Sequence, residues 1–335
     1  MATFDSLINV DEWISDHYFT TDETKGESFI KRVKARTKEW AALEDETGSL
    51  SPVKRFQQLR GELQSAFATG EDPEIAARVV RQAFGYGSPT TLSYERAGEV
   101  LSFRGWRGNA GTLIVVEALL NDDTTHEDLT SLPIAGGVAQ EGKEPVDTQV
   151  SKLIGDLFLA AEPPEFVVVV AGPWELVAER ESWPLGRYLA VNLQLVVERN
   201  DTKKAGELER TAVILARENL ERAADGTTWW ADTREESLQH AVKVSGDLRD
   251  AVRESIEIIG NDVLARRREQ HLPLDEIDGN ELARQSLRYL YRILFLLFAE
   301  ASSELAILPT GAPEYVEGYG LDRLRDQILN PPVTD

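Results

Sequence analysis

The chain has 335 residues and no cysteine, which excludes disulfide bonds, thiolate zinc sites and a cysteine nucleophile. Its 42% hydrophobic and 28% charged residues are typical of a soluble globular protein, and the length is enough for two domains. The formal net charge of −22 argues against a free-standing domain that binds duplex DNA, because DNA phosphates repel such a surface.

Residues 1–70 are expected to form a helical arm. Ile30, Val33, Thr37 and Trp40 are spaced to share one face of a helix, and three lysines fall on another face: Lys31, Lys34 and Lys38. The lysines are interpreted as a solvated face, with a helix that contacts phosphate as the alternative. A second helix follows, with Ser51 as its N-cap and Pro52 at its first position.

The next region, residues 71–200, alternates helices with extended segments. The expected order is helix, three strands, helix and two or three strands, which favours an α/β fold built on a mixed sheet. The expected helices are 73–84 and 146–162, and the expected strands are 90–95, 99–106, 111–120, 165–172, 174–183 and 186–199. The run EFVVVVAG is continuous and β-branched, which is typical of a strand buried on both faces.

Residues 201–335 are expected to be all-α. The expected helices are 205–223, 232–270, 279–309 and 320–329. The third is apolar on nearly every face, so burial is expected for it. It is too short to cross a bilayer and contains Arg292 and Glu300, and no signal peptide is evident. We therefore expect a cytoplasmic protein without a membrane partner.

The stretch GTLIVVEALLND, residues 111–122, raises the question of nuclease chemistry. In metal-dependent nucleases of the restriction-endonuclease type, such a strand carries an acidic residue, one spacer and a lysine, and the acids hold a hard cation such as Mg²⁺. Here Glu117 is followed by Ala118 and Leu119, and the preceding strand offers only Glu99 near its start. The pattern favours a nuclease-like core that lacks the catalytic acids and lysine. If the domain is an active nuclease, Glu117 and Glu99 are the expected ligands of the metal ion.

Two other motifs are weaker. Arg266 and Arg267 belong to a basic run near a helix end, where they suit the helix dipole, with DNA contact as the alternative. The sequence NPPV at 330–333 has a valine where DNA amino-methyltransferases carry an aromatic residue, so it is interpreted as a helix stop. No histidine pair has metal-ligand spacing, and His240 is interpreted as structural.

Several segments together resemble a known family. AERESWPLGRYLAVNLQLVVER, RYLYRILFLLFAEA and GYGLDRLRD are similar to the N-terminal region of large single-chain DNA adenine methyltransferases. These are the type IIG restriction-modification enzymes and their relatives in the BREX and DISARM phage-defence systems. The resemblance implies a nuclease-like domain, a helical connector and then a methyltransferase domain that uses S-adenosylmethionine, so this chain is expected to be part of a longer protein.

Three functions stay open from the sequence. The first is a non-catalytic N-terminal region that positions the methyltransferase and docks DNA or other defence-system subunits, with no cofactor of its own. The second is an active metal-dependent nuclease, and the third is a protein-binding adaptor.

Overall fold

A computed structural model describes residues 5–21, 27–69, 73–96, 98–120, 124–140, 143–275, 277–302 and 307–321. Its internal contacts divide the chain into two units, which we call the sheet unit (residues 1–242) and the helical unit (residues 243–335). The sequence suggested three regions instead, with boundaries at 70 and 200. The helices on both sides of those boundaries pack together, since α3 contacts α6 and α7.

The sheet unit contains a mixed sheet, as predicted. Its strands are β1 (Leu7–Val10), β2 (Thr90–Arg96), β3 (Glu99–Arg107), β4 (Leu113–Glu117), β5 (Val138–Gln140), β6 (Phe166–Ala171), β7 (Trp174–Glu179) and β8 (Tyr188–Asn192). The order across the sheet is β1-β8-β7-β6-β4-β3-β2, and β5 pairs with β3 beside this path. The β4–β6 pair is parallel and the other pairs are antiparallel.

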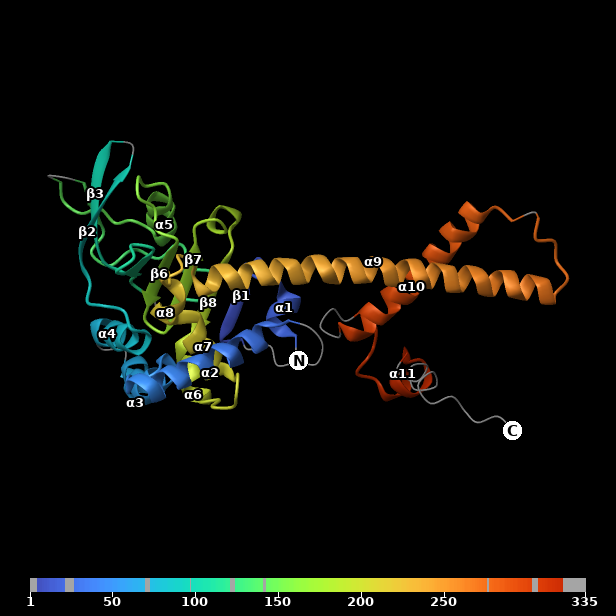
Figure 1. Cartoon of the computed structure of the whole chain (residues 1–335), viewed down its shortest axis with the longest axis horizontal. Helices are drawn as coiled ribbons and strands as arrows, with labels where there is room; N and C mark the ends of the chain where they lie inside the picture. The colour runs from blue at the N-terminus through green and yellow to red at the C-terminus, as the bar shows by residue number, and fades with distance from the viewer. Residues whose placement is uncertain are drawn as a thin grey trace. The chain divides into compact units, whose positions relative to one another are not determined.

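Helices cover both faces of the sheet (Figure 1). In the sheet unit they are α1 (Asp16–Thr20), α2 (Phe29–Thr47), α3 (Pro52–Thr69), α4 (Pro73–Phe84), α5 (Val150–Phe158), a 3-10 turn (Trp183–Leu185), α6 (Leu193–Arg199), α7 (Glu207–Leu215) and α8 (Arg217–Leu220). The first hydrophobic core joins one sheet face to α1–α4 and α6–α8, and the second joins the other face to α5. In Figure 1, α2, α3, α6 and α7 are accordingly gathered together, away from α5.

Strand β6 shows why the sequence forms this sheet. All six of its residues are buried, as its unbroken apolar run predicts. Phe166, Val168 and Val170 belong to the first core, while Val167 and Val169 belong to the second. The two-residue period of a strand therefore places one continuous apolar segment in both cores.

Three expectations for this unit are wrong, and the first is the single helix 205–223, which is divided at Ala216 into α7 and α8. Residues 7–10 form β1 and not a helix, because they pair antiparallel with β8. The predicted strand 186–199 is divided, since β8 ends at Asn192 and α6 begins there. The Asn192 side chain accepts a hydrogen bond from the backbone N–H of Leu195 (3.1 Å) and caps the helix.

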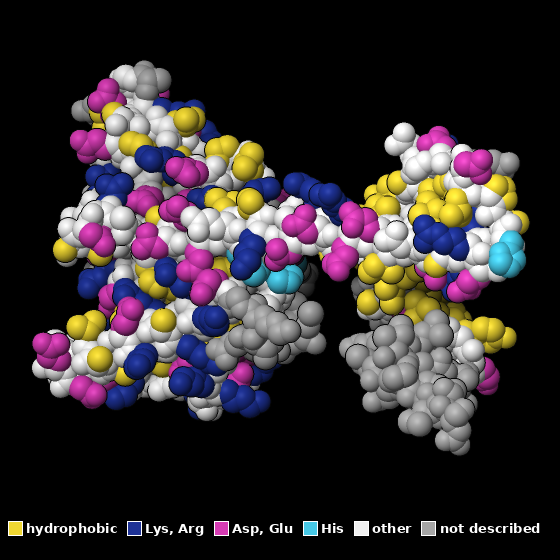
Figure 2. All heavy atoms as spheres, turned by 45° about the vertical axis from the view of Figure 1, so that its right-hand side comes forward, with side chains coloured by type: hydrophobic (Ala, Val, Ile, Leu, Met, Phe, Trp, Pro, Cys, Tyr) yellow, Lys and Arg dark blue, Asp and Glu magenta, His cyan; other side chains and the backbone are white. Residues whose placement is uncertain are grey.

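The helical unit begins within α9 (Trp229–Glu269) and continues through α10 (Gly279–Ala301) and α11 (Pro313–Gly318). The expected burial of α10 is wrong for most of its described residues, because Tyr291, Phe295 and Phe298 are 62%, 56% and 57% exposed. Figure 2 shows hydrophobic side chains gathered on the surface of this unit. Of the predicted helix 320–329, only residues 320 and 321 are among the described residues. The NPPV motif lies outside them.

Candidate functional site

The carboxylate of Glu117, at the end of β4, is held by an arginine. Arg81 on α4 points its guanidinium at Glu117, and its Nη1 contacts Glu117 Oε1. Both side chains are withdrawn from solvent, with 7% and 16% of their surfaces exposed. Arg81 reaches this position because α4 packs its apolar face against the sheet. A hard cation at Glu117 would have to displace a buried guanidinium, so the site is occupied by a fixed positive charge.

The structure does not bring Glu99 to Glu117. The register of β3 and β4 pairs Gly105 with Val116, which places position 104 opposite Glu117. Glu99 lies five residues further along β3, or roughly 17 Å at the rise of an antiparallel strand. Its side chain is also exposed. The two carboxylates proposed as nuclease ligands therefore cannot share one metal ion.

The position of the nuclease lysine holds an apolar side chain. Leu119 is 48% exposed, just beyond the end of β4, and its backbone N–H donates to the Pro133 carbonyl (2.9 Å). Within the described ranges, no group of three or more histidine, aspartate and glutamate side chains is placed to hold a metal ion.

A buried acid that the sequence analysis did not single out lies near Glu117. Glu175 on β7 is opposite Val170 of β6, which is in turn opposite Glu117 of β4. Glu175 is fully buried, and neither of its carboxylate oxygens has a hydrogen-bond partner among the described residues. Burial raises the pKa of Glu175 well above its ordinary value, which favours the neutral acid.

Glu179, four residues later on the same face of β7, has partners where Glu175 has none. It accepts from Trp13 Nε1 (3.3 Å) and Ser182 Oγ (2.7 Å), and it pairs with Arg234. The sequence did carry a signal for both acids. In WELVAE, Leu176 and Ala178 alternate with Glu175 and Glu179, so two acids share one face of a strand between apolar strands.

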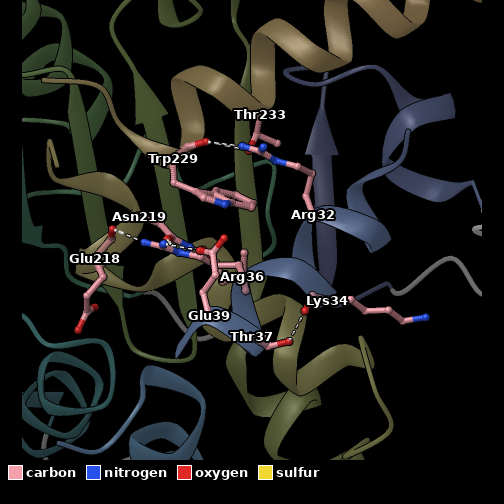
Figure 3. Close-up of polar contacts among 10 residues, drawn as sticks. Arg32, Lys34, Arg36, Thr37, Glu39, Glu218, Asn219, Trp229 and Thr233 are labelled. Atoms are coloured by element: carbon pink, nitrogen blue, oxygen red, sulfur yellow. Dashed lines mark hydrogen bonds and ion pairs between the residues drawn. The ribbon is translucent and has the colours of Figure 1, made fainter. Parts of the chain in front are cut away.

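Helix α2 points Arg32 and Arg36 to one side and Lys34 away from them (Figure 3). Arg32 donates to Thr233 Oγ1 (3.0 Å), and Arg36 donates to Asn219 Oδ1 (2.8 Å) and to the Glu218 carbonyl (3.1 Å). The guanidinium groups of these two arginines also lie over tryptophan rings, Arg32 on Trp229 and Arg36 on Trp40. The arginines therefore join α2 to α8 and to the start of α9.

The three candidate lysines lie on a different side of α2. Lys31 and Lys34 are half-buried and Lys38 is exposed, while Ile30, Val33 and Trp40 are buried as predicted. In Figure 3 the Lys34 side chain points away from the arginine contacts. The structure thus keeps the lysines on a side distinct from the packed side of the helix.

The candidate arginines near the end of α9 make local contacts. Arg266 pairs with Asp262 one turn earlier (2.7 Å), and Arg267 donates to the Pro273 carbonyl (2.8 Å) in the turn after the helix. Both contacts suit the role of cations at a helix C-terminus. His240 contacts His17 through ring nitrogens 2.9 Å apart, in agreement with a structural role.

No family model, curated protein or solved structure matches this chain. Among the described residues, no helix combines the length and hydropathy needed to span a bilayer.

Proposed function

We propose that this chain is a non-catalytic N-terminal region of a phage-defence or restriction-modification DNA adenine methyltransferase. The observation that carries the non-catalytic part is the buried Arg81–Glu117 pair. It places a guanidinium where a nuclease needs a metal ion. Leu119 in place of a lysine, and Glu99 on a distant part of β3, support the same conclusion.

The proposal includes a nuclease-like fold for the sheet unit. The element order α4, β2, β3, β4, α5 and β6, with β6 parallel to β4, is compatible with the nuclease-like core that the resemblance implies. Glu117 ends the central strand of that arrangement, as the catalytic acid of a nuclease would. We interpret the domain as a nuclease-like scaffold that retains the sheet and has replaced its chemistry with an internal ion pair.

The positioning role rests on the helical unit. The segments that carry the resemblance include RYLYRILFLLFAEA in α10, and α10 exposes Tyr291, Phe295 and Phe298. Exposed apolar surface of this kind suits contact with another protein surface, such as a methyltransferase domain or another subunit of the defence system. Any DNA contact would fall on the lysines of α2, and S-adenosylmethionine would bind the methyltransferase domain in the cytoplasm.

A second candidate function, a protein-binding adaptor without a methyltransferase, is favoured by the same exposed helix. The two candidates differ in what the complete gene encodes and in whether the complete protein methylates DNA.

The test has two parts. The complete open reading frame containing residues 1–335 is expressed in a host without adenine methylation, and N6-methyladenine is mapped by sequencing. We expect methylation of one short motif, which Glu117→Ala leaves unchanged. An unmethylated genome would favour the adaptor.

The second part addresses cleavage. Residues 1–335 are incubated with plasmid DNA and Mg²⁺ or Mn²⁺, beside Glu117→Ala and Leu119→Lys. We expect no nicking from any of the three proteins, because Leu119→Lys restores the lysine without releasing Glu117 from Arg81. Metal-dependent nicking by the wild type that disappears in Glu117→Ala would overturn the non-catalytic assignment.

A further inference from the structure

A small polar pocket lies at the end of the sheet opposite Glu117, where the parallel strands β4 and β6 begin. We call it the arginine pocket; its volume is about 210 Å³. It is bordered by the end of β3, the β3–β4 turn, the start of β6, the residue after β7 and the loop after α8. Its polar and charged side chains are those of Arg107, Thr112, Glu162, Glu165, Arg180 and Arg222.

Two residues that line this pocket each carry a buried donor with no partner among the described residues. Thr112 is only 6% exposed, and its hydroxyl oxygen makes no hydrogen bond. The Nε–H of Arg107 is likewise buried without an acceptor. A buried donor without an acceptor is unfavourable, so such groups are rarely left without a role. Both donors belong to residues that line one pocket.

The charge of the pocket differs in sign from that of the chain. Three arginines and two glutamates line it, which leaves a formal charge of +1 (three minus two), whereas the whole chain carries −22. Glu165 is already engaged, because it accepts from Arg222 Nε (3.2 Å) and from Thr228 Oγ1 (3.3 Å). Glu162 is exposed at the rim, and the exposed Arg180 makes no ion pair within the described part of the chain. Unused positive charge therefore borders the unpartnered donors.

We propose that the arginine pocket binds a phosphate group. Phosphate presents several acceptor oxygens and matches the planar, forked donors of arginine, which suits a pocket with one unpartnered hydroxyl and three guanidinium groups. The pocket is open to solvent, and its volume of about 210 Å³ leaves room for a phosphate. The phosphate is supplied either by a small molecule or by a nucleic-acid 5′ end.

This site is independent of the proposed methyltransferase role. Thr112 and Glu165 directly precede β4 and β6, whereas Glu117 ends β4. The pocket and the Arg81–Glu117 ion pair therefore lie at opposite ends of these strands. The pocket would bind phosphate equally well in an adaptor.

The first experiment is calorimetric titration of residues 1–335 with inorganic phosphate and with pyrophosphate, at an ionic strength held constant with NaCl. Thr112→Val removes the hydroxyl and keeps the shape of the side chain, and Arg180→Gln removes one guanidinium. We expect each substitution to weaken binding about tenfold, since a hydrogen bond to a charged group contributes about that factor. Arg187→Gln, an exposed arginine outside the pocket, is the matched control and leaves binding unchanged.

Thermal melting of the same proteins separates the proposal from an ordinary packing defect. If the Thr112 hydroxyl serves only as an unsatisfied group, Thr112→Val is at least as stable as wild type, and phosphate raises the melting temperature of both proteins equally. That result, or an absence of heat with both anions, overturns the proposal. We expect phosphate to raise the melting temperature of the wild type more than that of Thr112→Val.

A third titration distinguishes the two sources of phosphate. A short single-stranded oligonucleotide with a 5′-phosphate is compared with the same oligonucleotide carrying a 5′-hydroxyl. Tighter binding of the phosphorylated form, lost in Arg180→Gln, identifies a nucleic-acid end. Equal weak binding of both oligonucleotides, beside clear binding of pyrophosphate, identifies a small-molecule phosphate.

Discussion

The sheet unit buries its apolar residues, whereas the helical unit exposes many of its own. In the sheet unit, all six residues of β6 are buried and two hydrophobic cores cover the two sheet faces. In the helical unit, the buried hydrophobic residues among those described are Leu290 and Ala299, while Phe295 and Phe298 are more than half exposed. Apolar content alone therefore does not produce a core, because burial also requires a second layer to pack against.

The difference assigns different roles to the two units. The sheet unit buries most of its apolar side chains within its own two cores and is expected to fold by itself. The helical unit presents apolar surface of the kind that marks contact sites in soluble proteins. Under the proposed function, the first unit is a scaffold and the second carries the contacts with other domains or subunits.

Division of the chain after Val242 should give the largest effect. Residues 1–242 keep the buried part of α9, including Trp230, Thr233 and Ser237, so this fragment is expected to melt cooperatively. Residues 243–335 are expected to lack a cooperative transition when alone. Circular dichroism melts and sedimentation of both fragments check this. A sharp melting transition for monomeric 243–335 would contradict the comparison.

A matched pair of phenylalanines tests burial directly. Phe166 is fully buried and Phe295 is 56% exposed. We expect Phe166→Ala to lower the free energy of unfolding by about 3–5 kcal/mol, because it removes the ring from a packed core. Phe295→Ala should change it by less than about 0.5 kcal/mol. Urea unfolding of the two variants gives both values, and similar losses would show that α10 is covered in solution.

Loss of an ion pair should cost more stability in the sheet unit than in the helical unit. Arg81→Met leaves Glu117 as a partly buried, unpaired carboxylate, and we expect a loss of about 3 kcal/mol in unfolding free energy. Arg253→Met removes a partner from Glu257 on the exposed surface of α9, for which about 0.3–0.5 kcal/mol is typical. Chemical denaturation measures both. The double variant Arg81→Met/Glu117→Met should recover most of the loss, and its failure to do so would mean that Arg81 acts through packing alone.

The smallest expected effect concerns Glu175, a buried acid in the sheet unit that has no hydrogen-bond partner among the described residues. Glu175→Met should raise the free energy of unfolding at pH 8 by about 1–3 kcal/mol, because it removes a buried carboxyl group without hydrogen bonds. Glu179→Met, on the same strand face, should instead lower it, since Glu179 has three partners. A loss of stability in Glu175→Met would show that Glu175 has a partner in solution.

The pH dependence of Glu175 has a defined sign. Burial raises its pKa in the folded protein, so the folded state holds the proton more tightly than the unfolded chain. The contribution of Glu175 is fully present below the unfolded-state pKa of about 4.3 and falls as pH rises towards the folded-state pKa, by up to about 1.4 kcal/mol per unit. Urea unfolding between pH 5 and pH 8 should therefore show a steeper decline for wild type than for Glu175→Met.

Local patterns in the sequence were sufficient for the elements that have their own signals. Helices α2, α3 and α4, strands β2, β3, β4 and β6, and the mixed character of the sheet follow from periodicity and from caps. The Ser51 hydroxyl does lie 3.4 Å from the backbone nitrogen of Lys54, as expected for an N-cap. The candidate acid Glu117 was also found by sequence, because it ends an apolar strand.

Other features depended on segments far apart in the chain. Strand β1 has four residues and exists because β8 lies beside it, so no local signal marks it. The partner of Glu117 comes from α4, 36 positions earlier, and the isolation of Glu175 follows from what packs over its strand. The sequence by itself determined the helices and strands that carry a local signal, since these depend on neighbours along the chain, but it did not determine β1 or the change from strand to helix at Asn192. The tertiary structure alone decided which charges are paired and which apolar faces are covered, since both depend on contacts between distant residues.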